Sequence, residues 1–424
     1  DRFSYDTDPE SRLHQEKHPV GMDRYCIYGD AALDAPGEWF FDRENRQLRI
    51  IPPEGKSANE MKIEIKTMPE ALVVEKAAHV EISGFQFYGT TFRVDDLWSG
   101  LVENIDIKYG STIANPFGPN LPHPAVKAER FSARQWFGET SLDALTEVYG
   151  QKTTIRNITS RFCEGPAITI GGEDNILENC LFEDIDWHGL DYGYGIDLLA
   201  AAPVTVRRVT LERCGGSEGL RLANHGPSLV EFCYLHHCGL RQSDGAIIQT
   251  SMAGTAGTEI RYNWIHDHNA FHWGGNGIRA DDQARGMHIH HNVVWNCKEK
   301  GIVVKGDEHR VHHNTCFNNE RIDILVPRNR LPGKPEELEK QNQNTVTHHN
   351  IGTVTGSWIW EEPKLAPYGE TRDNLDSDPE FLRDPANHDF RLKVNSAAAR
   401  FGALPNDGAN WNAGYLSPKK RSAD

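Results

Sequence analysis

The chain has 424 residues, of which 38% are hydrophobic and 25% are charged, a composition typical of a globular protein and not of a disordered one. No stretch approaches the roughly 18 consecutive apolar residues of a membrane-spanning helix. The net charge of −16 argues against a protein that binds nucleic acid through its phosphates.

Residues 1–62 are predicted to form an N-terminal flap that contains a β-hairpin. Two apolar runs, Gly37-Glu-Trp-Phe-Phe-Asp42 and Leu48-Arg-Ile-Ile51, flank a polar turn, and Pro52-Pro-Glu-Gly55 ends the second run. The chain opens in a polar stretch without a signal peptide, so a mature or trimmed form is expected.

Residues 63–354 are predicted to form an array of short strands, interrupted by an inserted loop over residues 110–150. Four prolines (116, 119, 122 and 124) make the first part of this insertion irregular. Insertions in repeat proteins commonly lie on the functional face, so the loop is expected to wall a groove.

A Gly-led phrase recurs within this array at spacings of 24, 26, 32 and 24 residues. The copies read Gly195-Ile-Asp-Leu-Leu199, Gly219-Leu-Arg-Leu-Ala-Asn-His225, Gly245-Ala-Ile-Ile-Gln-Thr250, Gly277-Ile-Arg-Ala-Asp-Asp282 and Gly301-Ile-Val-Val-Lys-Gly-Asp307. Each phrase alternates as a strand does, and a period of roughly 20 to 50 residues indicates a solenoid.

Stacking the phrases on their glycines predicts two columns of outward side chains. The fourth residues after Gly form the column Leu199, Ala223, Gln249, Asp281 and Lys305, and the second residues form the column Asp197, Arg221, Ile247, Arg279 and Val303. Charged groups in the middle of a strand face are costly unless they are solvated and useful. This face is therefore the predicted site.

Asparagine and histidine recur at a second set of positions. The asparagines, expected to form one ladder at the bends, are Asn157, Asn179, Asn263, Asn292, Asn314 and Asn350. Paired histidines lie beside them, at 236–237, 290–291, 312–313 and 348–349. Stacked structural histidines are the favoured interpretation, a transition-metal site is the alternative, and no metal ligand is assigned.

The eight cysteines lack CxxC or zinc spacing and are interpreted as buried apolar fillers, with disulfides as the alternative. Residues 355–424 are loop-rich and are expected to cap the last coil. Short strands, Gly and Asn at bends, and a coil of 22 to 26 residues predict an all-β, right-handed parallel β-helix.

The order of the hairpin, the Ile-His-His-Asn coils, Asp378-Pro-Glu-Phe381 and Asp389-Phe-Arg-Leu392 resembles bacterial carbohydrate-active β-helix proteins. The nearest groups are glycoside hydrolase families 120 and 141, within the pectate-lyase-like superfamily. This resemblance covers most of the chain and implies the fold, but hydrolases, lyases and epimerases share such coils.

Glycoside hydrolysis needs two carboxyl groups, one to protonate the leaving oxygen and one to attack or to activate water. Asp281 and Asp282 resemble the tandem pair of polygalacturonase-like hydrolases, although Gln249 stands where those proteins have a third Asp. Asp244 is the expected acid, about 16 Å along the strand from Asp281 unless the chain bends. Glu218 and Asp244 are expected at equivalent positions on adjacent coils, about 4.8 Å apart, which would suit a retaining pair.

Simpler interpretations exist for the same residues. Asp281 and Lys305 would form a salt bridge if they face each other on adjacent coils, Asp244 is a frequent turn residue, and Asp282 would cap a strand end. The residues predicted to bind substrate are Arg221, Arg279, Lys305, Glu218, His225, His272 and Gln249. Trp136, Trp187 and Trp273 would stack on sugar faces or belong to the core.

The favoured function is a glycoside hydrolase. Its predicted substrate is an acidic or decorated oligosaccharide, because Arg binds carboxylate or sulfate with paired hydrogen bonds. The alternatives are a polysaccharide lyase, with Lys305 as base and Arg279 neutralising the uronate, and a non-catalytic glycan-binding β-helix. No cofactor is expected except a calcium ion if the protein is a lyase. The expected partner is a carbohydrate, not a nucleic acid or a membrane, and the expected location is secreted or periplasmic.

Overall fold

The computed structural model describes residues 2–3, 25–26, 30–42, 44–111, 145–187, 194–199, 203–223, 226–251, 253–270, 274–328, 330–331, 334–338, 342–358, 365–393, 398, 400–403, 411 and 413–416. These residues form strands and short 3-10 helices. None of the described residues forms a helix long and apolar enough to cross a membrane. The chain divides into two compact units, Asp1–Thr67 and Met68–Asp424.

The first unit contains the predicted hairpin. Strands β3 (Trp39–Asp42) and β4 (Gln47–Ile50) pair antiparallel, with Trp39 opposite Ile50. The Asp42 carboxylate accepts hydrogen bonds from the backbone N–H groups of Glu44 and Asn45, which closes the turn. The unit's other described elements are β1 (Arg2–Phe3), β2 (Tyr25–Cys26), η1 (Asp30–Ala32) and η2 (Ala58–Glu60).

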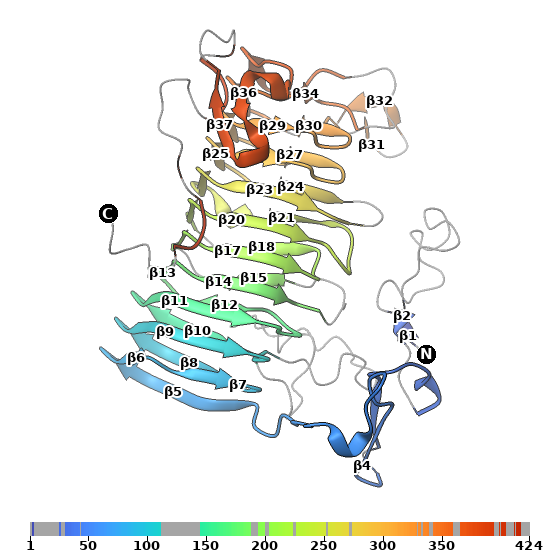
Figure 1. Cartoon of the computed structure of the whole chain (residues 1–424). Coiled ribbons are helices and arrows are strands. Elements are labelled where there is room, and N and C mark those ends of the chain that lie inside the picture. The colour runs from blue at the N-terminus through green and yellow to red at the C-terminus, as the bar shows by residue number, and fades with distance from the viewer. Residues whose placement is uncertain are drawn as a thin grey trace. The chain divides into compact units, whose positions relative to one another are not determined.

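The second unit is a right-handed parallel β-helix, which confirms the predicted fold class (Figure 1). One sheet contains eleven described strands stacked in parallel. These strands are β5 (Glu70–Ala78), β8 (Thr91–Trp98), β10 (Glu147–Gln151), β12 (Ile168–Gly171), β15 (Tyr194–Leu199), β18 (Glu218–Ala223), β21 (Gly245–Thr250), β24 (Gly275–Ala280), β27 (Lys300–Val304), β30 (Ile322–Leu325) and β34 (Val354–Thr355).

Two further parallel series complete the coils, and the long strands β9 (Leu101–Lys108) and β11 (Thr154–Arg161) belong to both. The first series also contains β6 (Glu81–Ser83), β13 (Asn175–Glu178), β16 (Val204–Arg207), β19 (Leu229–Glu231), β22 (Glu259–Arg261), β25 (His288–His290), β28 (Arg310–His312), β33 (Val346–His348) and β35 (Glu370–Arg372). The second also contains β7 (Gln86–Tyr88), β14 (Leu181–Ile185), β17 (Thr210–Cys214), β20 (Tyr234–Cys238), β23 (Trp264–His268), β26 (Val293–Trp295) and β29 (Thr315–Phe317).

Most of the inserted loop predicted over residues 110–150 lies outside the described residues. Its end was placed too late, because β10 already begins at Glu147 and pairs with β8 and β12. The parallel pairing also continues past residue 354, since β35 pairs with β33.

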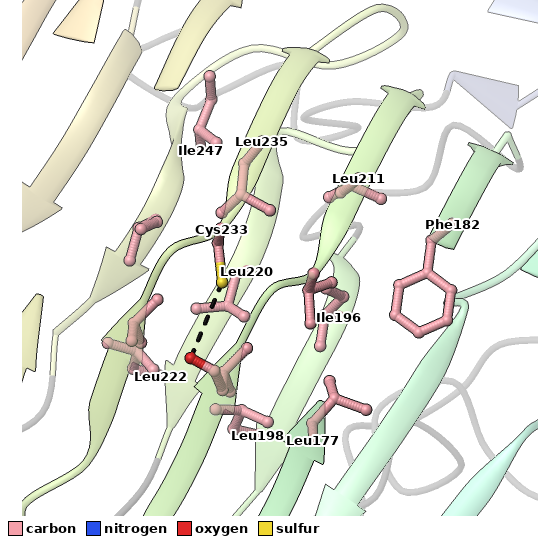
Figure 2. Packing of buried hydrophobic residues seen from close by; sticks show 14 of the residues in the cluster. Leu177, Phe182, Ile196, Leu198, Leu211, Leu220, Leu222, Cys233, Leu235 and Ile247 are labelled. Atoms are coloured by element: carbon pink, nitrogen blue, oxygen red, sulfur yellow. Dashed lines mark hydrogen bonds between the residues drawn. The ribbon is translucent and has the colours of Figure 1, made fainter. Parts of the chain in front are cut away.

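The interior is a continuous column of apolar side chains contributed by all three series. Figure 2 shows part of it, with Ile196, Leu198, Leu220 and Leu222 of the first sheet and Leu211 of β17 in the second series. All five are fully buried, and each such side chain stabilises the fold by about 1.5 to 3 kcal/mol. This inward alternation leaves the residues between them on the outer face of the sheet.

Cysteine acts as an apolar filler in this interior, as the favoured interpretation predicted. The seven cysteines whose side chains are described are all free and buried. Burial raises the pKa of Cys180 and that of Cys233 to about 12, so these thiols remain protonated.

The predicted asparagine ladder is two ladders, offset by one residue. Asn263, Asn292, Asn314 and Asn350 form a buried ladder that ends at the partly buried Asn374, and each of the four donates a side-chain N–H to the next Oδ1, at 2.8 to 3.0 Å. Their own backbone is not left-handed: that conformation belongs to the residue before each Asn, such as Tyr262 and His291.

Asn104, Asn157 and Asn179 form the second ladder and do adopt the left-handed conformation. The sequence could not distinguish the two ladders, because Asn can occupy either the left-handed position of a bend or the position after it.

The C-terminal region packs on β23, β26 and β29 of the second series, which agrees with the predicted loop-rich cap. Strands β36 (Leu382–Asp384) and β37 (Asp389–Leu392) pair antiparallel, and Phe390 packs against Trp264, Trp295 and Phe317. Further along the tail, the N–H of Leu416 donates to Asn179. The remaining described elements are η3 (Ala253–Thr255), β31 (Arg330–Leu331), β32 (Lys334–Leu338), η4 (Pro379–Phe381) and η5 (Pro385–Asn387).

Candidate active site

The outer face of β15, β18, β21, β24 and β27 carries the predicted site residues. Their strand register places Asp197, Arg221, Gln249, Arg279 and Val303 opposite one another on successive coils. Figure 1 shows these five strands stacked one above the other in the order in which they follow along the chain.

Two details of the predicted columns are wrong. Gln249 lies between Arg221 and Arg279 rather than beside Asp281, because Ile248 pairs with Leu220 and with Ile278. The glycine of this copy misled the alignment: Gly245 pairs with Gly275, two positions before Gly277. Ile247 therefore is not in the arginine column.

The same shift corrects the predicted relation of Glu218 and Asp244. Gly245 lies against the backbone of Ser217, so Asp244 is displaced by two positions along the strand and the two acids are not opposite each other. They still interact, since the charge of Asp244 contributes to the pKa of Glu218.

Arg221 is held by Asp197 and Tyr194. Its Nε and Nη2 donate to the two carboxylate oxygens of Asp197 at 2.7 and 2.8 Å, and its guanidinium carbon lies 3.7 Å from the Tyr194 ring centroid. Asp197 is fully buried. Burial alone would lower the pKa of Arg221, but the Asp197 charge and Tyr194 raise it above its usual value. This guanidinium is a fixed positive charge.

Arg279 joins the two acids that were expected to be about 16 Å apart along a strand. Its Nη1 donates to Asp244 Oδ1 at 2.8 Å, and its Nη2 pairs with Asp281. Lys305 also pairs with Asp281 and lies 3.5 Å from Asp282. The expected salt bridge between Asp281 and Lys305 is thus present, within a larger network.

The acids of this network differ in exposure. Asp281 has 7% of its side chain exposed, Asp244 has 31%, and Asp282 has 68%. Burial opposes ionisation of Asp281, but Arg279 and Lys305 overcome it and hold the pKa of Asp281 below its usual value. Asp281 is a buried anchor for two cations, whereas Asp244 faces solvent.

Glu218 has the opposite electrostatic character. Burial raises its pKa to about 8, and the carboxylates of Asp197 and Asp244 add to the rise, while Arg221 and Arg279 oppose it. Its Oε2 is buried without a hydrogen-bond partner among the described residues, and so is Oε1 of Gln249 on the next coil. Glu218 is therefore a neutral carboxylic acid at pH 7, with an unused oxygen beside Arg221.

Two further charged residues of this face were not predicted. Lys300 pairs with Glu299 at 2.5 Å, and its ammonium lies 5.3 Å from the Trp358 ring centroid. Lys300 pairs in register with Asn276, and Glu218 with Tyr194. Each of these four residues directly precedes the Gly of its phrase. The alignment on glycine could therefore have predicted that they face their neighbours on adjacent coils.

Asp197 is the other residue whose partnership was missed. It was placed in the arginine column but not assigned to the site, although opposite charges at equivalent positions on adjacent coils indicate an ion pair. His225, His272, Trp136 and Trp273 lie outside the described residues. Trp187 is partly buried at the end of the segment 145–187.

The described acids of this face do not converge as a cation site. Asp197, Asp244, Asp281 and Glu299 each pair with an Arg or Lys side chain. Three His, Cys, Asp or Glu side chains do converge at two other places in the described chain: His288, His290 and His312, and His237, His266 and Asp267.

Residues 145–322 match the family model described as a right-handed β-helix region, which agrees with the observed fold. This match covers less than half of the chain. A search of curated proteins found no match.

Several solved structures resemble the chain at low sequence identity. Pectate lyase Pel9A is 14% identical over 78% of this chain and 73% of its own, with a TM-score of 0.41. A PL6-family polysaccharide lyase from Pseudopedobacter saltans is 12% identical, covering 79% and 96%, with a TM-score of 0.40. XylC in complex with xylose is 13% identical, covering 86% and 67%, with a TM-score of 0.44. Similarities of this size do not assign an activity.

Proposed function

We propose that the protein is a glycoside hydrolase whose general acid is Glu218. The observation that carries this proposal is the burial of Glu218 near solvent-facing Asp244, because burial raises the pKa of Glu218 to about 8 against the charges of Arg221 and Arg279. A carboxyl group with such a pKa retains its proton at pH 7 and can deliver it to a glycosidic oxygen. Its Oε2, which is buried and bonds to no described residue, is the atom proposed to carry this proton.

Asp244 is the proposed partner carboxylate. It lies close enough to Glu218 for its charge to raise the pKa of that group, and Arg279 holds it by a hydrogen bond of 2.8 Å. Since its side chain is 31% exposed, it can reach an anomeric carbon or a water. A protonated acid beside a solvent-facing carboxylate is the pair that glycoside hydrolysis requires.

Asp281, predicted from the sequence to be the base or nucleophile, receives a different role in this proposal. Arg279 and Lys305 both pair with it and hold its pKa below its usual value, so it carries no proton to donate. It positions Arg279, which in turn positions Asp244. Asp282 lies at the exposed rim, 3.5 Å from Lys305.

We propose a neutral sugar as substrate, in place of the acidic one that the arginines alone suggested. Among the described residues of this face, Arg221, Arg279, Lys300 and Lys305 all pair with carboxylates. An anionic sugar would have to displace these acids. Glu218 and Gln249 instead offer unpaired buried oxygens, which suit sugar hydroxyls.

The test measures release of reducing ends from neutral oligosaccharides and aryl glycosides, alongside ultraviolet absorbance of unsaturated products. Glu218→Gln is expected to lower kcat/KM by about 10² to 10⁴ on poor leaving groups, and by less on activated aryl groups that need no proton. Asp244→Asn is expected to lower it on both.

The control is Glu147→Gln, because Glu147 is buried in the same outward column as Asp197 but lies two coils away from it. Wild-type activity of Glu218→Gln on poor leaving groups would refute the proposed acid.

One observation favours a polysaccharide lyase as the second candidate. Burial lowers the pKa of Lys300, against the charge of Glu299, and such a lysine is the kind of base that abstracts a proton in β-elimination. Lys305, the base first considered, pairs with both Asp281 and Asp282. An unsaturated product lost in Lys300→Met and retained in Glu218→Gln would establish this alternative.

A further inference from the structure

Three histidines from two adjacent coils converge on a face of the β-helix that the proposed hydrolase chemistry does not use. His288 and His290 lie at the two ends of β25, and His312 lies at the end of β28, opposite His290. The residues between them, Ile289 and Val311, point into the core. Strand alternation therefore places the three imidazoles together on the outside.

The three rings surround one point. Their centroids are 4.1 Å apart for His288 and His290, 4.8 Å for His288 and His312, and 5.0 Å for His290 and His312. One nitrogen from each ring lies within 4.8 Å of the others. Zn–N bonds of about 2.0 to 2.1 Å place two ligands about 3.3 Å apart, so rings this close need only small movements to hold a tetrahedral ion.

Glu259 supplies a carboxylate at the same point. It lies on β22, opposite His288, and its Oε1 is 2.6 Å from Nε2 of His290. Arg261, which also pairs with Glu259, is shared with Glu231 at 2.8 Å. The positive charge of Arg261 is thus already balanced by two acids, while Arg310, opposite His288 on β28, is a second cation beside the cluster.

We propose that His288, His290 and His312 bind a divalent transition-metal ion of the zinc class, with Glu259 as fourth ligand. Imidazole nitrogen and carboxylate oxygen together are the donors that such ions take in proteins. The ion would tie three successive coils together, those of β22, β25 and β28.

An entering ion requires two of these rings to move slightly apart. Nε2 of His288 and Nε2 of His312 are 2.6 Å apart and would separate by under about 1 Å to hold the ion.

His348 belongs to the same column of histidines but is not one of the proposed ligands. Its ring stacks on His312 at 5.0 Å, and its strand β33 pairs with β28, yet it does not belong to the convergent group. Replacing His348 therefore removes a stacked imidazole without removing a proposed ligand, which separates metal binding from ring stacking.

Zinc titration of the full chain, purified without a histidine tag and treated with chelator, tests the site by calorimetry. The wild type is expected to bind one equivalent of ZnCl₂ at this site. His312→Ala and His288→Gln are expected to weaken that binding at least tenfold, and His348→Ala by less than twofold. Absence of zinc binding, or equal weakening by His348→Ala, would overturn the assignment.

Cobalt(II) provides a second measurement that does not depend on how well one variant folds. The site predicts intense visible bands of a four-coordinate ion with nitrogen ligands, lost in His288→Gln, whose ring is only partly buried. A thiolate charge-transfer band would place the ion at a cysteine and overturn the proposal. So would binding that survives His288→Gln but not Asp267→Asn, since that would place it at the second histidine cluster.

Discussion

Glu218 and Asp281 are both buried carboxyl groups on one sheet face, yet their pKa values shift in opposite directions, because burial dominates at Glu218 and two paired cations overcome burial at Asp281. Glu218 lies near two acids and bonds through Oε2 to no described residue, whereas Asp281 pairs with Arg279 and Lys305. Groups whose surroundings separate their pKa values are those able to divide acid and base roles. Here the neutral member of the face is Glu218.

Asp281→Asn is expected to lower the free energy of unfolding substantially and to leave the activity of the folded protein within about 10² of the wild type. The change leaves Arg279 and Lys305 buried with one fewer carboxylate, which costs about 3 to 5 kcal/mol. Urea unfolding measures this, with Asp282→Asn as control at less than about 0.5 kcal/mol, because Asp282 is exposed. A stable Asp281→Asn protein with activity lowered by more than about 10² would instead make Asp281 a catalytic carboxylate.

The residues of this face could be predicted from sequence, but their contacts could not. The Gly-led phrases correctly placed Arg221 and Arg279 on one outer column. Gly245 pairs two positions away from the place that aligning it with Gly219 predicted. This shift in register could not be predicted, because the sequence does not show whether two glycines at the start of such phrases occupy the same position in the coil. The pKa of Glu218 depends on side chains from four coils, which no local sequence pattern reveals.

At the scale of elements, the buried asparagine ladder joins the coils along one bend. Asn292 donates to Asn314, and its Oδ1 accepts from the backbone N–H and the side chain of Asn263. Asn292→Ala is expected to lower the free energy of unfolding by at least about 1 to 3 kcal/mol, the cost of leaving such groups buried and unpaired. Exposed Asn269→Ala is the control, and equal values for the two variants would remove the ladder's structural role.

The C-terminal strands β36 and β37 are part of the folded core and not a detachable tail. Phe390 is fully buried, and its ring lies 4.9 Å from that of Trp295 and 5.3 Å from that of Trp264. Phe390→Ala is expected to cost about 3 to 5 kcal/mol. Phe162→Ala removes a ring that is 45% exposed and should cost much less. A stability loss for Phe390→Ala no larger than that of the control would show that the cap contributes little.

The elements themselves follow from period and alternation, which is why the β-helix and the hairpin could be predicted. Offsets of a single residue were harder to predict. The two asparagine ladders differ in whether Asn itself or the residue before it is left-handed, and the sequence pattern Xaa-Asn-Xaa is the same for both.

For the molecule as a whole, buried neutral histidines predict loss of stability in acid. Burial lowers the pKa of His236 to about 2 and the pKa values of His268 and His309 to about 4. Below about pH 6.5 the unfolded chain binds protons that the folded chain does not, so stability falls as pH falls. Each buried histidine contributes a loss on the order of 1 kcal/mol by pH 5.5.

Glu218 acts in the opposite direction over the same range, because its raised pKa makes the folded chain hold the extra proton. One group against at least three leaves the net direction unchanged. Urea midpoints at pH 7.5 and 5.5 measure the difference, and a midpoint that stays constant or rises in acid would contradict the assignment of neutral histidines.

The ionisation of Glu218 tests the central claim most directly, and it can be measured without knowing the substrate. Carbon NMR of glutamate-labelled protein, with Glu218→Gln to identify the signal, follows the carboxyl carbon through a pH titration. The account predicts a midpoint near 8, far above the usual value of 4.5. A midpoint near 4.5 would mean that Glu218 is ionised at neutral pH, and the proposed proton donor would be lost.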